Sequence, residues 1–194
     1  MKKIISLAVI LCCLVALVAC GSPTASFESA LAVKGFSKAT ITQTTETALG
    51  DLTGTFTVTY NDDGTATIDY EYEQWNDFTS NSTELKSTVT GSVTRQADGS
   101  YSDGKGFNGS ADEITAGFAI NLESVRDSAT VDGSTLTVTV PADSTEAVLG
   151  VDLGVDATLT VVIAGTTLSE VTVSYTVVDD DDDEYTNTIN CKSE

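Results

Sequence analysis

The fold class is decided by the stretch LTGTFTVTYNDDGTATIDYEY, which occupies residues 52–72. In Leu52–Tyr60, threonine alternates with apolar residues and Gly54, which is the period-two pattern of a β-strand with one buried face. Residues 61–64 then supply the turn sequence Asn-Asp-Asp-Gly, and residues 66–72 resume the alternation. The stretch therefore predicts an antiparallel β-hairpin.

The same alternation recurs along the chain, between turns marked by Gly, Asn and Asp. Further strands are expected at 85–93, 118–122, 125–131, 136–140, 157–163, 171–177 and 185–191. Pro141 ends one of them, and residues 143–149 suit a short helix closed by Gly150. Another short helix is expected at 26–33, with Ser26 as its cap. The chain is predicted to be all-β, either an antiparallel curved sheet or a β-sandwich of about nine or ten strands.

The N-terminus has the organisation of an export signal. Lys2 and Lys3 precede an uncharged apolar run over residues 4–19. This run is shorter than the about 20 apolar residues that a membrane-spanning helix needs. The pattern therefore favours a cleaved signal over a permanent transmembrane anchor.

The run ends in Leu17, Val18, Ala19 and Cys20, which resembles the lipobox of bacterial lipoproteins. The resemblance implies cleavage after Ala19 and attachment of diacylglyceryl to the Cys20 thiol. It divides the chain into a signal peptide at 1–19, a lipid-anchored tether at 20–25 and one β-rich domain at 26–194. It places the protein in the cell envelope, on the extracytoplasmic side of a membrane. The alternative is an ordinary secretory signal followed by a chance cysteine.

The acidic composition restricts the partners. The formal net charge is −20, from 9 basic and 29 acidic residues. A nucleic acid partner is excluded in this interpretation because phosphate binding needs clustered basic residues. No polybasic segment would hold the body against anionic lipid, so the lipid on Cys20 is the expected membrane contact. The domain is expected to be a monomer.

Catalytic and metal sites are not expected. The chain has no histidine, which removes Ser-His and Cys-His mechanisms and most zinc sites. Carboxylates alone could serve a glycosidase, but pairs of them are inevitable among 29 acids. The sequence therefore predicts a protein that is not an enzyme, with no cofactor.

Two acidic segments could bind calcium through oxygen ligands. The first contains Asp98, Ser100, Ser102 and Asp103. The second is the run of six acids at 179–184, which joins two alternating flanks and should therefore be a hairpin loop. Solvated turns are the favoured interpretation of both, and the six-acid loop is expected to be extended.

Aromatic residues suggest a recognition surface. Trp75 and Phe78, together with Tyr70 and Tyr72, could stack on a sugar or peptide. The alternative, which is favoured, is that Trp75 closes the end of the sheet. Cys191 lies in an alternating pattern and is expected to be a buried strand cysteine rather than a reactive thiol.

Two functions remain open. The first is a membrane-anchored binding or interaction module with a protein or carbohydrate ligand. The second is a carrier that holds apolar ligands in a cavity of a curved sheet, as the lipoprotein-carrier family does with a similar architecture. Small residues at inward positions (Gly54, Ala66, Gly91 and Ala157) permit such a cavity without requiring it.

Overall fold

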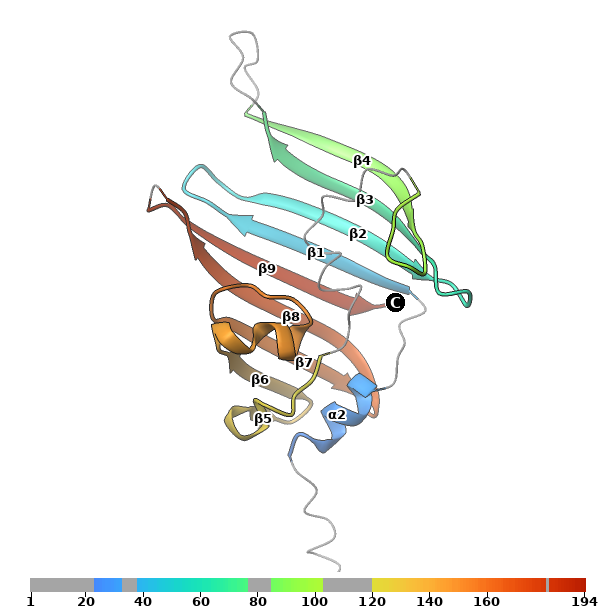
Figure 1. The fold of residues 1–194 in the computed structure, drawn as a ribbon, viewed down its shortest axis with the longest axis vertical. Coiled ribbons are helices and arrows are strands. Elements are labelled where there is room, and N and C mark those ends of the chain that lie inside the picture. The colour runs from blue at the N-terminus through green and yellow to red at the C-terminus, as the bar shows by residue number, and fades with distance from the viewer. Residues whose placement is uncertain (1–22, 33–37, 77–84, 103–119, 181) are drawn as a thin grey trace, which may run out of the picture.

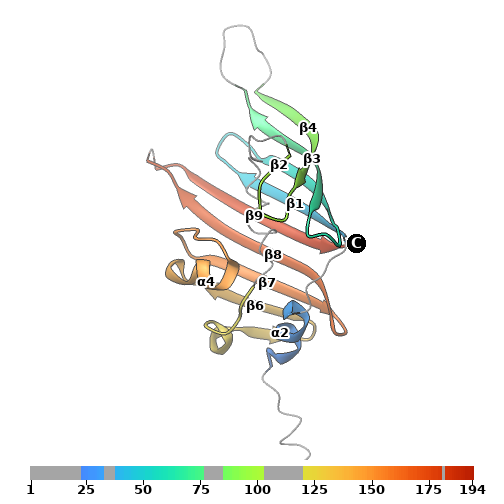
Figure 2. The same cartoon turned by 45° about the vertical axis from the view of Figure 1, so that its right-hand side comes forward.

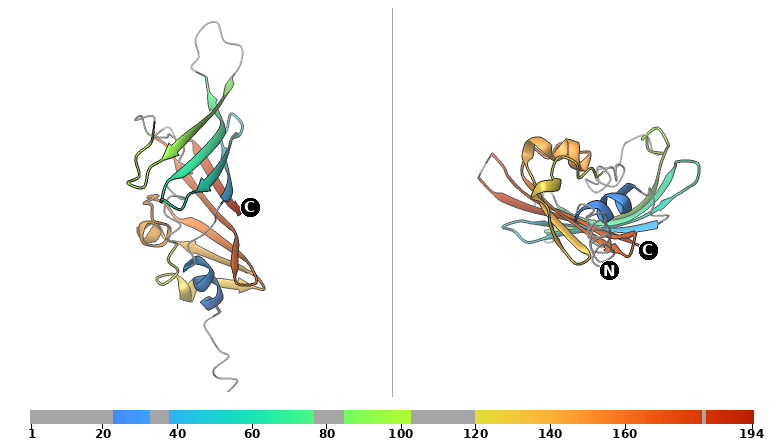
Figure 3. Two further views of the ribbon diagram at one scale, coloured as in Figure 1. Left: turned by 90° about the vertical axis from the view of Figure 1, so that its right-hand side faces the viewer. Right: turned by 90° about the horizontal axis from the view of Figure 1, so that it is seen from below.

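The computed structural model describes residues 23–32, 38–76, 85–102, 120–180 and 182–194. These residues form one open, curved antiparallel sheet with two short helices on its concave side (Figures 1 and 3). The all-β prediction is confirmed, and of the two architectures left open the structure has the curved sheet. The described strands are β1(Lys38–Glu46), β2(Leu52–Tyr60), β3(Ala66–Trp75), β4(Lys86–Arg95), β5(Thr130–Asp132), β6(Thr135–Val140), β7(Ala157–Ala164), β8(Thr167–Val178) and β9(Glu184–Ser193).

The strand order is β4-β3-β2-β1-β9-β8-β7-β6-β5. Each half of the chain forms a meander, β1 to β4 and β5 to β9. The two meanders are joined at the centre of the sheet, where β1 pairs antiparallel with β9 and Ile41 lies opposite Cys191. The first and last strands thus unite both halves in one sheet.

The two faces of the sheet differ in composition. The inner face carries the core, whose fully buried side chains include Ile41, Ile68, Leu136, Leu159 and Ile189. The outer face carries mostly threonine. One row of directly paired outer residues crosses all nine described strands: Thr130, Thr137, Thr160, Thr172, Asn190, Thr42, Thr55, Glu71 and Thr90. The predicted alternation of threonine with apolar residues is therefore the division between these two faces.

Helix α2(Ala25–Ala32) packs against β7 and β8 on the inner face. It begins one residue before the expected helix at 26–33. Ser26 lies in its first turn, so its prediction as the cap is wrong. Thr24 precedes the helix instead, and its hydroxyl donates to Glu28 Oε1 at 3.0 Å. The Glu28 carboxylate also accepts from Arg126 Nε at 2.7 Å, which ties α2 to the loop before β5.

The second helical segment follows Pro141 as predicted. It consists of the 3-10 turn η2(Ala142–Ser144) and helix α4(Thr145–Leu149). Gly150 closes it at φ 78°, a conformation that favours glycine. Figures 1 and 2 place both α2 and α4 over the half of the sheet that contains β6 to β8.

The strand expected at 125–131 is only partly correct. Residues Arg126–Ser128 form the 3-10 turn η1, and only the short β5 follows it. The hydroxyl of Ser128 donates to the Val125 carbonyl at 2.9 Å, a local bond that competes with the ladder of a sheet. Ile120 and Leu122 are buried but lie outside the strands, and Phe118 lies outside the described residues.

Three hairpin turns share one geometry. Their described residues are 61–65, 96–100 and, in the acidic run, 179, 180, 182 and 183. In each, the N–H of the first residue donates to the carbonyl of the fifth, and the N–H of the fourth donates to the carbonyl of the first. The fourth residue has a positive φ, which is 83° at Gly64, 87° at Gly99 and 64° at Asp182. The described residues of the acidic run (179, 180 and 182–184) therefore have the hydrogen bonds of the two glycine-containing turns, and the expectation that the loop is extended is wrong.

Candidate functional site

Three aromatic rings lie together on the inner face of β2 and β3, and we call them the aromatic cluster: Phe56, Tyr70 and Tyr72. The ring centroids of Tyr70 and Tyr72 are 5.8 Å apart, and those of Phe56 and Tyr72 are 6.4 Å apart. Phe56 is buried, whereas both tyrosines are half-buried. Partly exposed tyrosines offer an apolar ring and a polar hydroxyl to a ligand, as sugar and peptide sites do.

Two glycines provide the space for these rings. A β-carbon at Gly91 would lie 2.4 Å from Tyr70 Oη, and one at Gly54 would lie 3.0 Å from the Phe56 ring. Both glycines were predicted to be inward positions that could leave a cavity. The rings of Tyr70 and Phe56 instead lie directly over them, which is a known way to protect glycine in a sheet.

A second group of contacts lies on the outer face of the same strands, and we call it the outer cluster: Thr53, Glu73, Trp75 and Lys86. Lys86 Nζ lies 5.2 Å from the centre of the Trp75 ring and 3.8 Å from Glu73 Oε2, and it donates to the Asp51 carbonyl. The backbone N–H and hydroxyl of Thr53 donate to Glu73 at 3.0 and 3.1 Å. These bonds, with a smaller contribution from Lys86, lower the pKa of Glu73.

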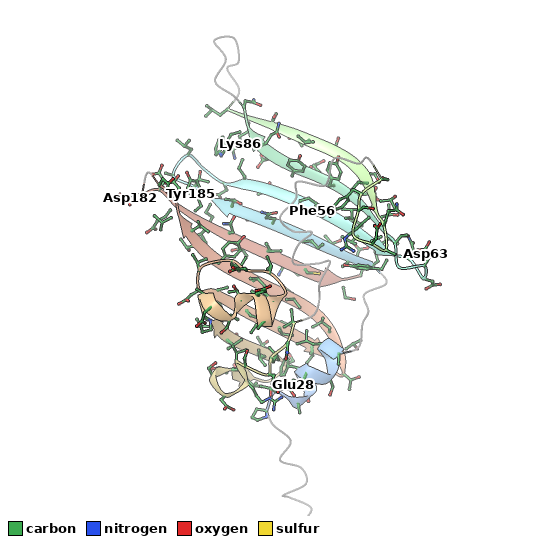
Figure 4. The ribbon with its side chains drawn as sticks, viewed as in Figure 1. Glu28, Phe56, Asp63, Lys86, Asp182 and Tyr185 are labelled. Carbon is green, nitrogen blue, oxygen red and sulfur yellow. The ribbon has the colours of Figure 1, made fainter. Side chains whose placement is uncertain are left out.

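The predicted aromatic surface is therefore divided between the two faces. Tyr70 and Tyr72 lie on the inner face, and Trp75 lies on the outer face because it is an odd number of residues away in the same strand. Phe78 lies outside the described residues. Trp75 is the last residue of β3, and its ring packs beside Lys86 of β4. Figure 4 shows the positions of Phe56 and Lys86 on this part of the sheet.

Sequence reasoning did not find Phe56 or Lys86 as members of the two clusters. Phe56 shares the inward parity of β2, and its place beside Tyr72 depends on the register in which Gly54 lies opposite Tyr72. Lys86 lies opposite Trp75 across the β3–β4 hairpin. Alternation along β3 was the available signal, because it alone predicts that Trp75 lies on the face opposite to Tyr70 and Tyr72.

The first calcium candidate is a hydrogen-bonded hairpin turn. The Asp98 carboxylate accepts from the N–H and hydroxyl of Ser100 at 2.9 and 2.7 Å, and these bonds lower its pKa. Ser102 Oγ accepts from the Thr94 N–H at 3.2 Å. Asp103 lies outside the described residues.

In the second calcium candidate, both carboxylate oxygens of Asp179 accept hydrogen bonds from residues of the same hairpin. Its Oδ1 accepts from the Asp183 N–H at 3.0 Å, and its Oδ2 accepts from the Tyr185 hydroxyl at 2.8 Å. Asp182 is exposed and lies at the tip of the β8–β9 hairpin (Figure 4). Within the described residues, no cluster of three or more Asp, Glu, Cys or His side chains is arranged to hold a metal ion.

Cys191 is buried on the inner face of β9, where it was expected. Burial raises the pKa of its thiol to about 12, so the reactive thiolate is disfavoured. Cys20 lies outside the described residues.

Within the part of the chain that the structure describes, no helix has the length and apolar character needed to cross a membrane. Comparison of the chain with protein-family models, with curated proteins and with solved structures found no match.

Proposed function

We propose that this protein is a bacterial lipoprotein, held by lipid on Cys20 in the cell envelope on the extracytoplasmic side, and that its β-domain is a binding or interaction module. The observation that carries the proposal is the order of features at the N-terminus. Lys2 and Lys3, the apolar run at 4–19 and Cys20 follow one another as in lipoprotein precursors. Two acyl chains suffice for stable attachment to a bilayer.

The position of α2 supports an arrangement with one end of the sheet near the membrane. Five residue steps separate Cys20 from Ala25, the first residue of α2, and they span at most about 17 Å. Helix α2 packs on β7 and β8, so the tether attaches to the half of the sheet that ends in β5. Strand β4 is six strand spacings from β7, or about 29 Å. The aromatic and outer clusters therefore lie at the end remote from the anchor.

The packing of the inner face favours an interaction module over a carrier of apolar ligands. The rings of Phe56 and Tyr70 lie over Gly54 and Gly91, so they occupy space that an apolar ligand would need. The half-buried tyrosines and the outer cluster offer stacking and hydrogen-bonding groups instead. A protein or carbohydrate partner suits such groups.

The Cys20→Ala variant tests the anchor. Cells that express the full chain would be labelled with a radioactive fatty acid, and the membrane and soluble fractions would be compared. The natural chain should be labelled and sediment with membranes, whereas the Cys20→Ala variant should carry no label. The Cys191→Ala variant is the matched control, because it removes the buried thiol and leaves the lipobox intact. Equal labelling of the Cys20→Ala variant would overturn the proposal.

A further inference from the structure

The two edges of the sheet are protected to different extents. Strand β5 is only three residues long, and a short edge strand offers little backbone to another chain. Strand β4 has ten residues, contains no proline and pairs with β3 in an unbroken register. Among the described residues, its other side meets only the Tyr101–Ser102 segment, at Arg95 and Thr94.

The hydrogen bonds at both ends of β4 show which residues face outward from the sheet edge. The Leu85 carbonyl accepts from the Asn76 N–H, so Leu85 faces β3. The N–H and carbonyl of Thr94 bind Ser102, so Thr94 faces away from β3. Because these directions alternate along a strand, Thr88, Thr90 and Ser92 also direct their N–H and carbonyl groups away from β3. Each of them can therefore bind the backbone of an added strand.

A row of acids lies directly behind this edge. On the outer face, Ser92, Thr90 and Thr88 lie opposite Asp69, Glu71 and Glu73 of β3. An added strand would lie two strand spacings from these acids, or about 10 Å, with only small hydroxyl side chains between. The long side chains of lysine and arginine can extend across such residues to a carboxylate. Basic residues at alternate positions of the added strand would therefore meet Asp69 and Glu71.

The inner side of the same edge carries apolar residues on either side of Ser87. Val89 and Gly91 lie there, and Leu85 just before the strand is 56% exposed. The inward residues of an added strand would lie beside these positions. Apolar side chains at the positions between the basic ones would cover Leu85 and Val89.

From these observations, we propose that the edge of β4 is a strand-addition site for an extended segment of a partner protein in which basic and apolar residues alternate. The inference deepens the proposed interaction module and rests on it for its biological setting. A second copy of this chain fits less well. It would present Thr88, Thr90 and Ser92 instead of basic residues, and it would bring another net charge of −20.

The test uses the full lipidated chain in non-ionic detergent and a fluorescent nonapeptide of alternating lysine and valine. Fluorescence anisotropy should show saturable binding of this peptide. The matched glutamate–valine peptide should bind at least about tenfold more weakly, because like charges oppose one another at the interface. Equal binding of both peptides would overturn the proposal, and so would dimers of the protein that the lysine peptide does not dissociate.

Variants locate the site. Thr90→Pro removes an N–H that faces away from the sheet, which edge strands tolerate, and it should abolish binding of the lysine peptide. Asp69→Asn with Glu71→Gln should weaken binding severalfold. The control pair, Asp132→Asn with Glu146→Gln, removes equal charge at the other end of the sheet and should bind as the natural chain does.

Amide hydrogen exchange keeps the test decisive if Thr90→Pro does not fold. Addition of the lysine peptide to the natural chain should slow exchange at Thr88, Thr90 and Ser92. Protection elsewhere, without protection of these three amides, would overturn the proposal. The Cys20→Ala variant should retain peptide binding whether or not the lipid anchor exists, so the two proposals can fail separately.

Discussion

The turn at residues 179–183 allows a quantitative test of backbone strain, because two other turns in the chain have the same hydrogen bonds with glycine at the equivalent position. Asp182 has a φ of 64°, where Gly64 and Gly99 have 83° and 87°. The left-handed conformation costs an ordinary L-residue about 1–2 kcal/mol, and aspartate pays toward the lower end of this range. Asp182→Gly should therefore raise the free energy of unfolding by about 1 kcal/mol.

The gain has a second, electrostatic part. Asp182 lies among the other carboxylates of the run at 179–184. Replacing it with glycine removes the repulsion between its charge and theirs. Salt at physiological concentration screens exposed charges over about 8 Å, so this part should shrink as salt rises. The backbone part should persist at high salt. For a domain of this size, 1 kcal/mol corresponds to a rise of about 2–4 °C in Tm.

Thermal and urea unfolding of the natural chain and three variants would measure both parts. Asp182→Asn removes the charge and keeps a side chain, so it should recover mainly the salt-sensitive part. Gly64→Ala forces a β-carbon onto the equivalent backbone of another turn and should lower stability by about 1 kcal/mol. The reasoning is refuted if the gain of Asp182→Gly disappears entirely at high salt, or if Gly64→Ala costs nothing.

Three further predictions concern packing, titration and calcium. Gly91→Ala should destabilise the fold by about 1–3 kcal/mol, because the added carbon overlaps Tyr70 Oη. Urea unfolding should show that this loss of stability vanishes when Tyr70→Ala is also present. The buried Cys191 thiol has its pKa raised from 9.0 to about 12, so the unfolded chain loses this proton first and stability should fall between pH 9 and 12. Cys191→Ala should lack that share of the alkaline loss, and an unchanged slope would contradict the assignment. Calcium should leave Tm unchanged, because both carboxylate oxygens of Asp179 already accept hydrogen bonds. The contrary result would be a calcium-dependent rise in Tm that is lost when residues 179–184 are replaced by Asn-Gly, and it would show a metal site.

The strands and hairpins could be predicted because their signals are local. Alternation with period two in Leu52–Tyr60 identifies both the strand and its buried face, and Gly64 identifies the turn that follows. The helical turn closed by Gly150 was found by the same kind of signal. Each depends only on residues a few positions apart.

The arrangement of the strands could not be predicted in this way. Strand β1 at the centre of the sheet was not singled out, since its alternation fades after Ile41 into polar residues. Its pairing with β9 joins residues about 150 positions apart, as Ile41 with Cys191, and no local pattern specifies such a contact. The compact turn at Asp182 was missed for a different reason, because glycine normally marks this geometry and aspartate does not.

Two acids on the outer face of β3, Asp69 and Glu71, differ from the residues around them. The row of paired residues that crosses the sheet is threonine or asparagine at eight of its nine positions, and Glu71 is the exception. Glu170, on the outer face of β8, lies 3.7 Å from Lys192. Asp69 and Glu71 have no hydrogen bond or ion pair to another described residue. Like charges two residues apart on one face repel, and threonine would suit the strand better. Their place beside Thr88, Thr90 and Ser92 of β4 fits the proposed partner, which would supply the opposite charge.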